Sequence, residues 1–234
     1  ETFLKFSGGA INDLTEDRED NMSQETSQRK LQHGTASPIA SKRKDSVSQY
    51  REAYRTLQGI SVLYEDEQKV LLNKPAGVLT QKAKDTDLSL NEWLIGYLLA
   101  TGSVTNEELA TFKPSVCNRL DRNTSGIVIC GKTLAGSQQL SERIRTRKIS
   151  KFYRTICVGE IRESALVEGY LYKDPRTNKV TVPGTPPAPA SPTEESSPIK
   201  TAYTPLHTNG AYTLLEVELI TGKTHQIRAH LASI

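Results

Sequence analysis

The sequence of 234 residues predicts an α+β fold with a mixed, mainly antiparallel sheet and flanking helices. Short apolar strands are interleaved with a few helices, in an order that is not the regular strand–helix–strand repeat of parallel sheets. No aromatic residue occurs between Phe6 and Tyr50, and six of the eleven prolines lie in residues 183–198. We therefore place the packed part in residues 49–174 and 200–234, about 160 residues, enough for a core without metal or disulfide support.

The two ends of the chain are expected to belong to something longer. Residues 1–48 are predicted to be a disordered linker, because residues 7–48 are polar and nearly balanced in charge. Residues 49–234 then form one domain with a flexible proline-rich insertion at 183–198. A helix expected to begin near Thr224 reaches Ile234 without a glycine or a basic cap, so we expect the domain to continue further.

The first half of the domain carries clear local signals. Two short apolar strands flank an acidic turn and predict a β-hairpin, and residues 74–77 close it with a second turn. Ser89 and Glu92 have the spacing of a capping box, which predicts a helix that ends at Gly102. Thr105 and Glu108 begin a second, shorter helix in the same way.

The second half is predicted from periodicity. Branched apolar residues at 126–129 indicate a buried strand, and the spacing of apolar residues in 133–147 indicates a helix. Strands are expected at 152–158, 165–172 and 211–220, the last with Leu215, Val217 and Leu219 on one face.

Positive charge is concentrated in one window. The net charge is only +3, but Lys113 to Arg154 contains ten Lys or Arg against Asp121 and Glu142, a net of +8. Such a run can be a solvated helix face or the contact surface for a polyanion such as nucleic acid. Because acids are nearly absent from it, nucleic acid is at least as good an interpretation.

Several classes of protein are disfavoured. No apolar run approaches the roughly 20 residues of a membrane-spanning helix, and no secretory leader is present. The three cysteines lack zinc-ligand spacing and are expected to be reduced, buried thiols in the cytoplasm. We predict no metal site.

The segment 118–126 carries the most informative chemistry. Asp121 stands between Arg119 and Arg122, on a loop that leads into the predicted buried strand. Two neighbouring cations favour an ionised carboxylate, which can act as a nucleophile or a base but not readily as a general acid. From charge pattern alone, the alternative is a structural ion pair in a turn.

Longer motifs identify a family. The segment Arg119-Leu120-Asp121-Arg122 followed by Thr124-Ser125-Gly126 strongly resembles the central motif of RluA-type RNA pseudouridine synthases, in the RluC/RluD branch. Residues 73–77 resemble the family's first motif, 151–153 its tyrosine-bearing strand, and 222–231 its last motif. The resemblance covers about Val62 to Val182 and Ile199 to the end, and it implies the pseudouridine synthase catalytic fold. Residues 1–8 weakly resemble the linker after an upstream RNA-binding domain.

The resemblance implies roles for the reacting groups. Asp121 is then the nucleophile that attacks the uridine, Arg228 its paired cation, and Tyr153 the residue that packs on the uracil and removes its proton. Ile227 is expected to form an apolar wall against the base. Lys74 and Pro75 are expected to shape the turn beneath the site.

The resemblance also implies RNA contacts. Arg119 is expected to enter the place vacated by the flipped uridine, because an extruded base leaves a gap that a guanidinium can fill. Asn118, which stands where the family more often has histidine, is also expected to contact RNA. The remaining residues expected to bind RNA, chiefly its phosphates, are Arg122, Arg143, Arg145, Arg147 and Lys148.

The function implied is isomerisation of specific uridines in RNA, without a cofactor, by a cytoplasmic monomer. Large-subunit ribosomal RNA is the expected substrate, and transfer RNA is possible. A non-catalytic RNA-binding or ribosome-assembly module on the same scaffold is the alternative. A small-molecule hydrolase using Asp121 is poorly supported, because no partner acid, Ser/His pair or metal set accompanies it.

Overall fold

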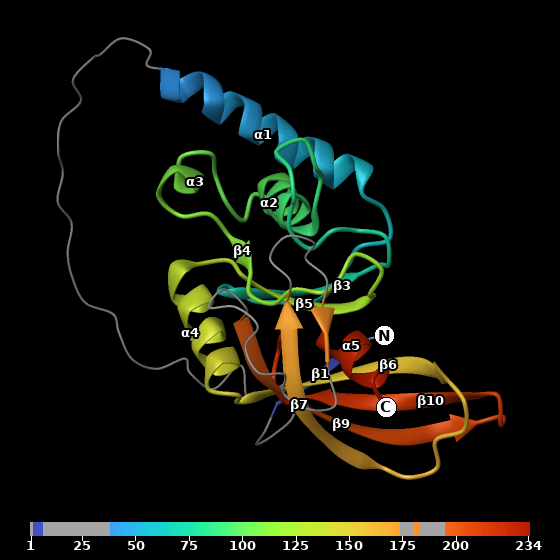
Figure 1. The fold of residues 1–234 in the computed structure, drawn as a ribbon. Helices are drawn as coiled ribbons and strands as arrows, with labels where there is room; N and C mark the ends of the chain where they lie inside the picture. Colours follow the sequence, from blue (N-terminus) through green and yellow to red (C-terminus); the bar gives the residue numbers. More distant parts are fainter. Residues whose placement is uncertain (1, 7–37, 174–179, 183–194) are drawn as a thin grey trace. The chain divides into compact units, whose positions relative to one another are not determined.

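The computed structural model describes residues 2–6, 38–173, 180–182 and 195–234 (Figure 1). The chain folds into two compact units, each built around its own antiparallel sheet. The four-stranded unit comprises residues 6–123 and 128–146, and the six-stranded unit comprises residues 1–5, 124–127 and 147–234. The predicted α+β class with mainly antiparallel strands is confirmed.

The four-stranded unit has the strand order β2-β3-β5-β4. Strands β2 (Ser61–Glu65) and β3 (Lys69–Lys74) form the predicted antiparallel hairpin, in which Asp66 accepts hydrogen bonds from the backbone N–H groups of Gln68 and Lys69. Strands β4 (Ser115–Val116) and β5 (Gly126–Gly131) are also antiparallel. Strand β5 is almost entirely buried, as its branched apolar residues predict.

The helices of this unit are α1 (Pro38–Thr56), α2 (Leu90–Ala100), α3 (Glu108–Thr111) and α4 (Leu134–Arg145). Both predicted capping pairs are formed, since Ser89 donates to the Glu92 carboxylate and Thr105 and Glu108 cap each other's backbone N–H groups. Helix α1 packs on α2 so closely that a Cβ at Gly96 would collide with the Tyr50 carbonyl.

Helix α1 corrects the predicted linker. Residues 38–48 were expected to be disordered, but they form the first half of α1. The helix is stabilised further along the chain, where Tyr50 and Ala53 are buried. Residues 2–6 form the short strand β1 (Thr2–Phe6), and residues 7–37 lie outside the described part of the chain.

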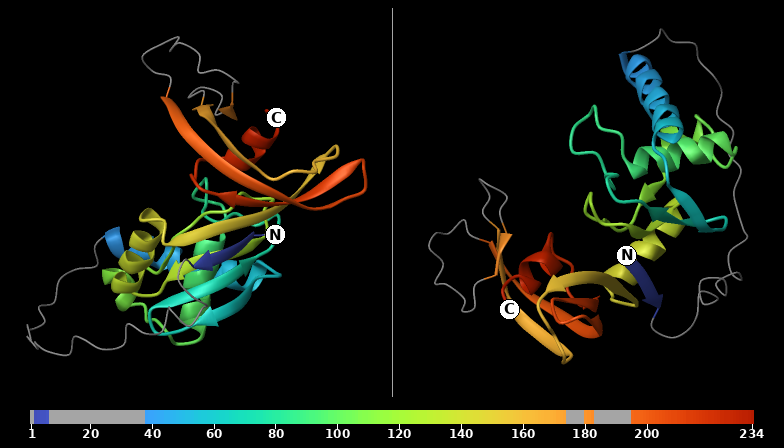
Figure 2. Two further views of the ribbon diagram at one scale, coloured as in Figure 1. Left: turned by 90° about the horizontal axis from the view of Figure 1, so that it is seen from below. Right: turned by 90° about the vertical axis from the view of Figure 1, so that its right-hand side faces the viewer.

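The six-stranded unit has the strand order β1-β6-β10-β9-β7-β8. Its strands are β6 (Ile149–Val158), β7 (Ala165–Lys173), β8 (Val180–Thr181), β9 (Glu195–Thr208) and β10 (Tyr212–Leu219), with helix α5 (Gln226–Leu231). Strands β6, β10, β9 and β7 are successive antiparallel neighbours, and Figure 2 shows them in two further views. Of the three residues predicted to share one face of β10, Leu215 and Val217 are fully buried and Leu219 is half-buried.

Two predictions for this unit, the bounds of the proline-rich insertion and the end of the last helix, need correction. The proline-rich insertion was expected to reach residue 198, but residues 195–198 already belong to β9, while 183–194 lie outside the described residues. Pro198 is tolerated because it pairs with Tyr170 of β7, at an end of β9 that extends beyond the pairing with β10. The last helix ends at Leu231, where the backbone N–H of Ala232 closes it, rather than running to Ile234.

None of the described helices is both long and apolar enough to cross a membrane.

Candidate active-site loop

Asp121 lies on the loop that connects β4 to β5, half-buried between two arginines. The start of the loop is tied to the sheet by two hydrogen bonds with Ile129. The Cys117 N–H donates to the Ile129 carbonyl at 2.7 Å, and the Ile129 N–H donates to the side-chain oxygen of Asn118 at 2.7 Å. The Asn118 side chain therefore takes the place of a backbone carbonyl as the acceptor for the Ile129 N–H of β5.

The residue before Asp121 is held by a single hydroxyl group. Thr80 is buried, and its Oγ1 accepts a hydrogen bond from the Leu120 N–H at 3.1 Å and donates one to the Leu120 carbonyl at 2.7 Å. Both backbone groups of Leu120 are thus satisfied by one side chain 40 residues away. This bridge fixes the peptide from which Asp121 begins.

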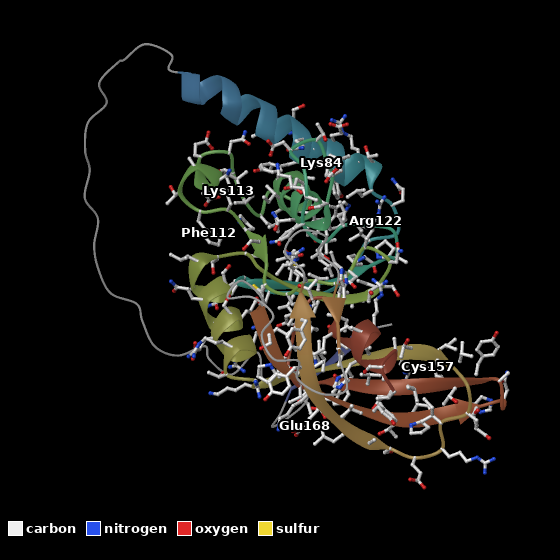
Figure 3. All side chains as sticks on the ribbon, in the orientation of Figure 1. Lys84, Phe112, Lys113, Arg122, Cys157 and Glu168 are labelled. Carbon is white, nitrogen blue, oxygen red and sulfur yellow. The ribbon has the colours of Figure 1, made fainter. Side chains whose placement is uncertain are left out.

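The residue after Asp121 is held by the turn at 74–77. The Arg122 carbonyl accepts from the Gly77 N–H at 2.8 Å and from Lys74 Nζ at 3.1 Å, and Arg122 Nε donates to the Gly77 carbonyl at 3.0 Å. Figure 3 labels Arg122 on this loop. Gly77 has φ +89°, a left-handed conformation that favours glycine, so the turn needs this residue.

Lys74 is a fully buried cation beneath the loop. Its ammonium donates to three backbone carbonyls, those of Pro75 at 2.9 Å, Val78 at 2.8 Å and Arg122 at 3.1 Å. An ammonium has three N–H donors, so the three acceptors satisfy it completely. The predicted structural role of Lys74 is confirmed by these bonds.

Lys74 also acts on the charge of Asp121. Burial lowers the pKa of Lys74 to about 8, and the attraction of Asp121 opposes that shift. The buried ammonium of Lys74 and the carboxylate of Asp121 therefore attract each other. The loop therefore carries a carboxylate with fixed neighbours on both sides and a buried cation nearby, which suits a nucleophile or a base.

Tyr153 lies on β6 in the six-stranded unit. It is half-buried, and its position is opposite Val217 of β10, which is in turn opposite Tyr203 of β9. These three residues share one face of the sheet, because facing residues of paired strands point to the same side. An aromatic ring with partial exposure can stack on a base.

Arg228 and Ile227 lie on α5, whose buried side is polar. Gln226 accepts from Thr221 Oγ1 at 2.9 Å and the Lys223 N–H at 3.1 Å, and its Nε2 donates to the Lys200 carbonyl and Thr201 Oγ1, both at 3.0 Å. The four bonds fix the start of the helix that carries Arg228.

His230 completes this polar contact one turn later. Its Nδ1 lies 2.9 Å from Thr201 Oγ1, which already accepts from Gln226. Thr201 Oγ1 therefore contacts both polar side chains of α5. Burial lowers the pKa of His230, which favours the neutral ring. Among the described residues Nε2 has no hydrogen-bond partner.

The predicted RNA-contact residues are distributed over both units. Arg119 and Arg122 are exposed on the Asp121 loop, and Arg143 and Arg145 lie in the last turn of α4. Arg147 and Lys148 are exposed at the start of the six-stranded unit. Arg145 forms a bidentate ion pair with Glu142, with N–O distances of 2.6 and 2.8 Å, so Glu142 offsets part of the charge of this helix.

The described residues contain no group of three His, Cys, Asp or Glu side chains placed to hold a metal ion. Cys130 is fully buried, and Cys117 and Cys157 are half-buried. Burial raises the pKa of all three thiols, so they are poor nucleophiles at neutral pH.

Sequence reasoning missed the groups that position the predicted site residues. Thr80 gives no sequence signal, because its partner is 40 residues away. Gln226 and His230 were visible, since a spacing of four places two polar residues on one face of a helix. The family resemblance drew attention to Arg228 and Ile227 instead.

Comparison with known proteins gives one consistent result. The family described as RNA pseudouridylate synthase matches residues 68–233. "Ribosomal large subunit pseudouridine synthase D" of Borreliella burgdorferi is 27% identical over 74% of this chain and 50% of its own length, and the Escherichia coli K12 protein of that name is 26% identical over 75% and 49%. An uncharacterized RNA pseudouridine synthase of Chloroflexus aurantiacus is 32% identical over 68% and 46%.

Solved structures agree in fold. "Human RNA Pseudouridylate Synthase Domain Containing 1" has a TM-score of 0.58 at 18% identity, covering 75% of this chain and 65% of that one. "Human RNA Pseudouridylate Synthase Domain Containing 4" has a TM-score of 0.56 at 20% identity, covering 81% and 68%. The chain spans about half the length of the curated relatives it matches.

Proposed function

This chain belongs to the RNA pseudouridylate synthase family, and we propose that it isomerises uridine to pseudouridine in RNA with Asp121 as the nucleophile. The observation that carries the proposal is the loop itself. Its carboxylate lies in the family's central motif, and the backbone of both neighbouring residues is fixed by hydrogen bonds from Thr80, Lys74 and Gly77. A fixed carboxylate near a buried cation meets the demands of nucleophilic attack.

The reaction needs no net change in composition. The Asp121 carboxylate attacks the nucleoside and forms a bond to the ribose carbon as the bond from that carbon to N1 of the base breaks. The base then turns, and its C5 forms the new bond to the ribose carbon as the bond to Asp121 breaks. Tyr153 takes the proton from C5 and passes it to solvent, while N1 gains one from solvent, so atoms and charges balance.

We assign Arg228 as the cation that pairs with Asp121, and Ile227 as an apolar wall for the base. Both assignments rest on the family resemblance. The hydrogen bonds of Gln226 and Thr201 support a positioning role for α5, because they hold the helix that carries Arg228 and Ile227. Arginine suits the pairing role because its planar guanidinium can bind a carboxylate through two hydrogen bonds.

We propose large-subunit ribosomal RNA as the substrate, in the cytoplasm, with the protein acting as a monomer. The printed names of the Borreliella and Escherichia relatives support the ribosomal substrate. Arg119 is proposed to fill the place of the extruded uridine. The phosphate contacts are assigned to Asn118, Arg122, Arg143, Arg145, Arg147 and Lys148. We also propose that residues 49–234 form the catalytic domain.

The test compares wild type, Asp121→Asn and the control Asp85→Asn on transcribed large-subunit ribosomal RNA. Pseudouridine formation is mapped site by site, and RNA affinity is measured in parallel. Asp121→Asn should abolish conversion with affinity within about threefold of wild type, whereas Asp85→Asn should behave as wild type. Conversion by Asp121→Asn at the wild-type rate would refute the mechanism. RNA binding without any conversion by wild type would favour a non-catalytic binding module.

A further inference from the structure

Lys151 is a half-buried lysine in the six-stranded unit that makes no hydrogen bond or ion pair with the described residues. It lies on β6, two residues before Tyr153. Residues two apart on a strand point to the same face and are separated by about 6.6 Å along the strand. The Lys151 ammonium therefore belongs to the same sheet face as the aromatic ring assigned to the uracil.

The fold makes room for this ammonium. A Cβ built on Gly222, in the segment between β10 and α5, would lie 2.9 Å from Lys151 Nζ. That distance is shorter than a Cβ contact in a folded protein, so any larger residue at 222 would displace the ammonium. Gly222 has no positive φ, so its backbone conformation does not require glycine, and a side chain at 222 would act by moving the Lys151 ammonium from its position.

A second cation lies close to the first. The charge of Arg147 adds to burial in lowering the pKa of Lys151, so the two groups repel each other. Arg147 has φ +57°, a left-handed conformation that is uncommon for a residue with a side chain. Neither cation has an ion-pair partner among the described residues, so together they form a place where an anion is attracted.

The acidic residues of the neighbouring strand face the other way. In the register of β6 with β10, Glu216 lies opposite Arg154 and Glu218 opposite Phe152, whereas Val217 lies opposite Tyr153. Glu216 and Glu218 therefore share the face of Arg154, and the face of Lys151 and Tyr153 has apolar neighbours on β10. Within the described part of the chain, the acidic residues of β10 thus lie on the face of Arg154 and not on the face of Lys151.

We propose that Lys151 and Arg147, with the space kept by Gly222, bind a phosphate group of the RNA strand beside the nucleotide that stacks on Tyr153. The ligand class is an RNA phosphate, and the proposal rests on the proposed function for its placement next to the reacting base. Lysine suits the role, since an ammonium binds phosphate as a point charge without fixed geometry. Such a contact adds affinity and positions the strand without reading sequence.

The test measures the salt dependence of RNA binding, which needs no turnover. A fluorescein-labelled 20-nucleotide oligouridylate is titrated at several KCl concentrations with wild type, Lys151→Gln and the control Arg154→Gln. The slope of log K against log salt changes by about 0.7 for each phosphate contact with a single strand. Lys151→Gln should lower the slope by about 0.7 and weaken binding about fivefold at 0.1 M salt. Arg154→Gln, on the opposite face of the same strand, should leave the slope unchanged.

Gly222→Ala provides an independent variant, because it displaces the ammonium without removing its charge. It should reproduce the loss seen with Lys151→Gln, and the two changes together should lose no more than Lys151→Gln alone. An unchanged slope in Lys151→Gln, or full additivity of the two changes, would overturn the phosphate site. Conversion of ribosomal RNA by wild type is assayed separately. If wild type forms no pseudouridine but Lys151→Gln still lowers the salt slope, the proposed function fails while the phosphate site stands.

Discussion

Replacing Thr80 by valine tests whether the backbone on one side of Asp121 must be fixed for catalysis. Valine has nearly the shape of threonine but cannot donate or accept, so Thr80→Val leaves the buried N–H and carbonyl of Leu120 without their partner. An unsatisfied buried group costs about 1–3 kcal/mol. With two such groups and some relaxation of the loop, we expect the free energy of unfolding to fall by about 2–3 kcal/mol.

The expected effect on catalysis is larger than the effect on stability. Thr80 touches neither Asp121 nor RNA in the proposed mechanism, so it is a positioning residue. A displacement of about 1 Å at the reacting group can cost about 10²-fold in rate. We therefore expect the single-turnover rate of pseudouridine formation to fall about 100-fold, with RNA affinity preserved. Thr80→Ser retains the hydroxyl and should recover most of the rate.

Thr213→Val is the matched control. Thr213 is also fully buried, and its Oγ1 accepts from the Ile161 N–H at 3.0 Å and donates to the Gly159 carbonyl at 2.8 Å. It makes the same kind of bridge, in a region without a predicted site residue. Urea unfolding should show similar destabilisation of both valine variants, with a loss of rate in Thr80→Val alone. An equal loss of rate in both, or none in Thr80→Val, would refute the positioning argument.

Three further predictions concern buried polar groups. The pKa of Lys74 is about 8 in the folded chain, so between pH 8 and 10.5 the unfolded chain binds more protons than the folded chain. The free energy of unfolding of wild type should therefore rise by about 3 kcal/mol relative to Lys74→Met over this pH range. A difference between the two proteins that stays constant with pH in urea unfolding would contradict this. Tyr97 donates to Glu65 at 2.7 Å, and this bond helps to lower the pKa of Glu65. Tyr97→Phe should therefore lose about 1–2 kcal/mol at neutral pH, and the loss should shrink as the pH falls through the lowered pKa of Glu65, as a series of equilibrium unfolding measurements from pH 7 downward would show. Gln226→Leu should lower the melting temperature and the conversion rate together, and a rate like that of wild type would show that α5 needs no polar anchor.

Elements with local causes were predicted well. The hairpin at β2 and β3 follows from two apolar runs around an acidic turn, and the side chain of Asp66 in that turn accepts the backbone N–H groups that the strands leave open. The capping pairs of α2 and α3 lie three residues apart in the sequence, so they are readable without knowing the fold. These signals need no information about distant contacts.

Elements with distant causes were missed or misplaced. Strand β9 contains Pro198 and Pro205, and its pairing with β10 shifts register between Leu214 and Leu215 of β10. Prolines and a register shift both disturb the alternation of apolar and polar residues by which a strand is predicted. Helix α1 begins in a polar stretch and is held by packing against α2, which composition does not reveal. The full burial of Lys74 also has no local signal, because lysine is among the residues least often buried.

The two arginines beside Asp121 look equivalent in the sequence, but their surroundings in the four-stranded unit differ. Arg122 holds the turn through the Gly77 carbonyl, and its own carbonyl receives Lys74 and Gly77. Arg119 is exposed and makes no hydrogen bond with the described residues. Only Arg119 can therefore leave its position without releasing the loop, which is the requirement for a side chain that must enter RNA while Asp121 stays fixed. This difference supports the proposal that Arg119 displaces the base, and it indicates that Arg122 helps to hold the loop of the proposed nucleophile.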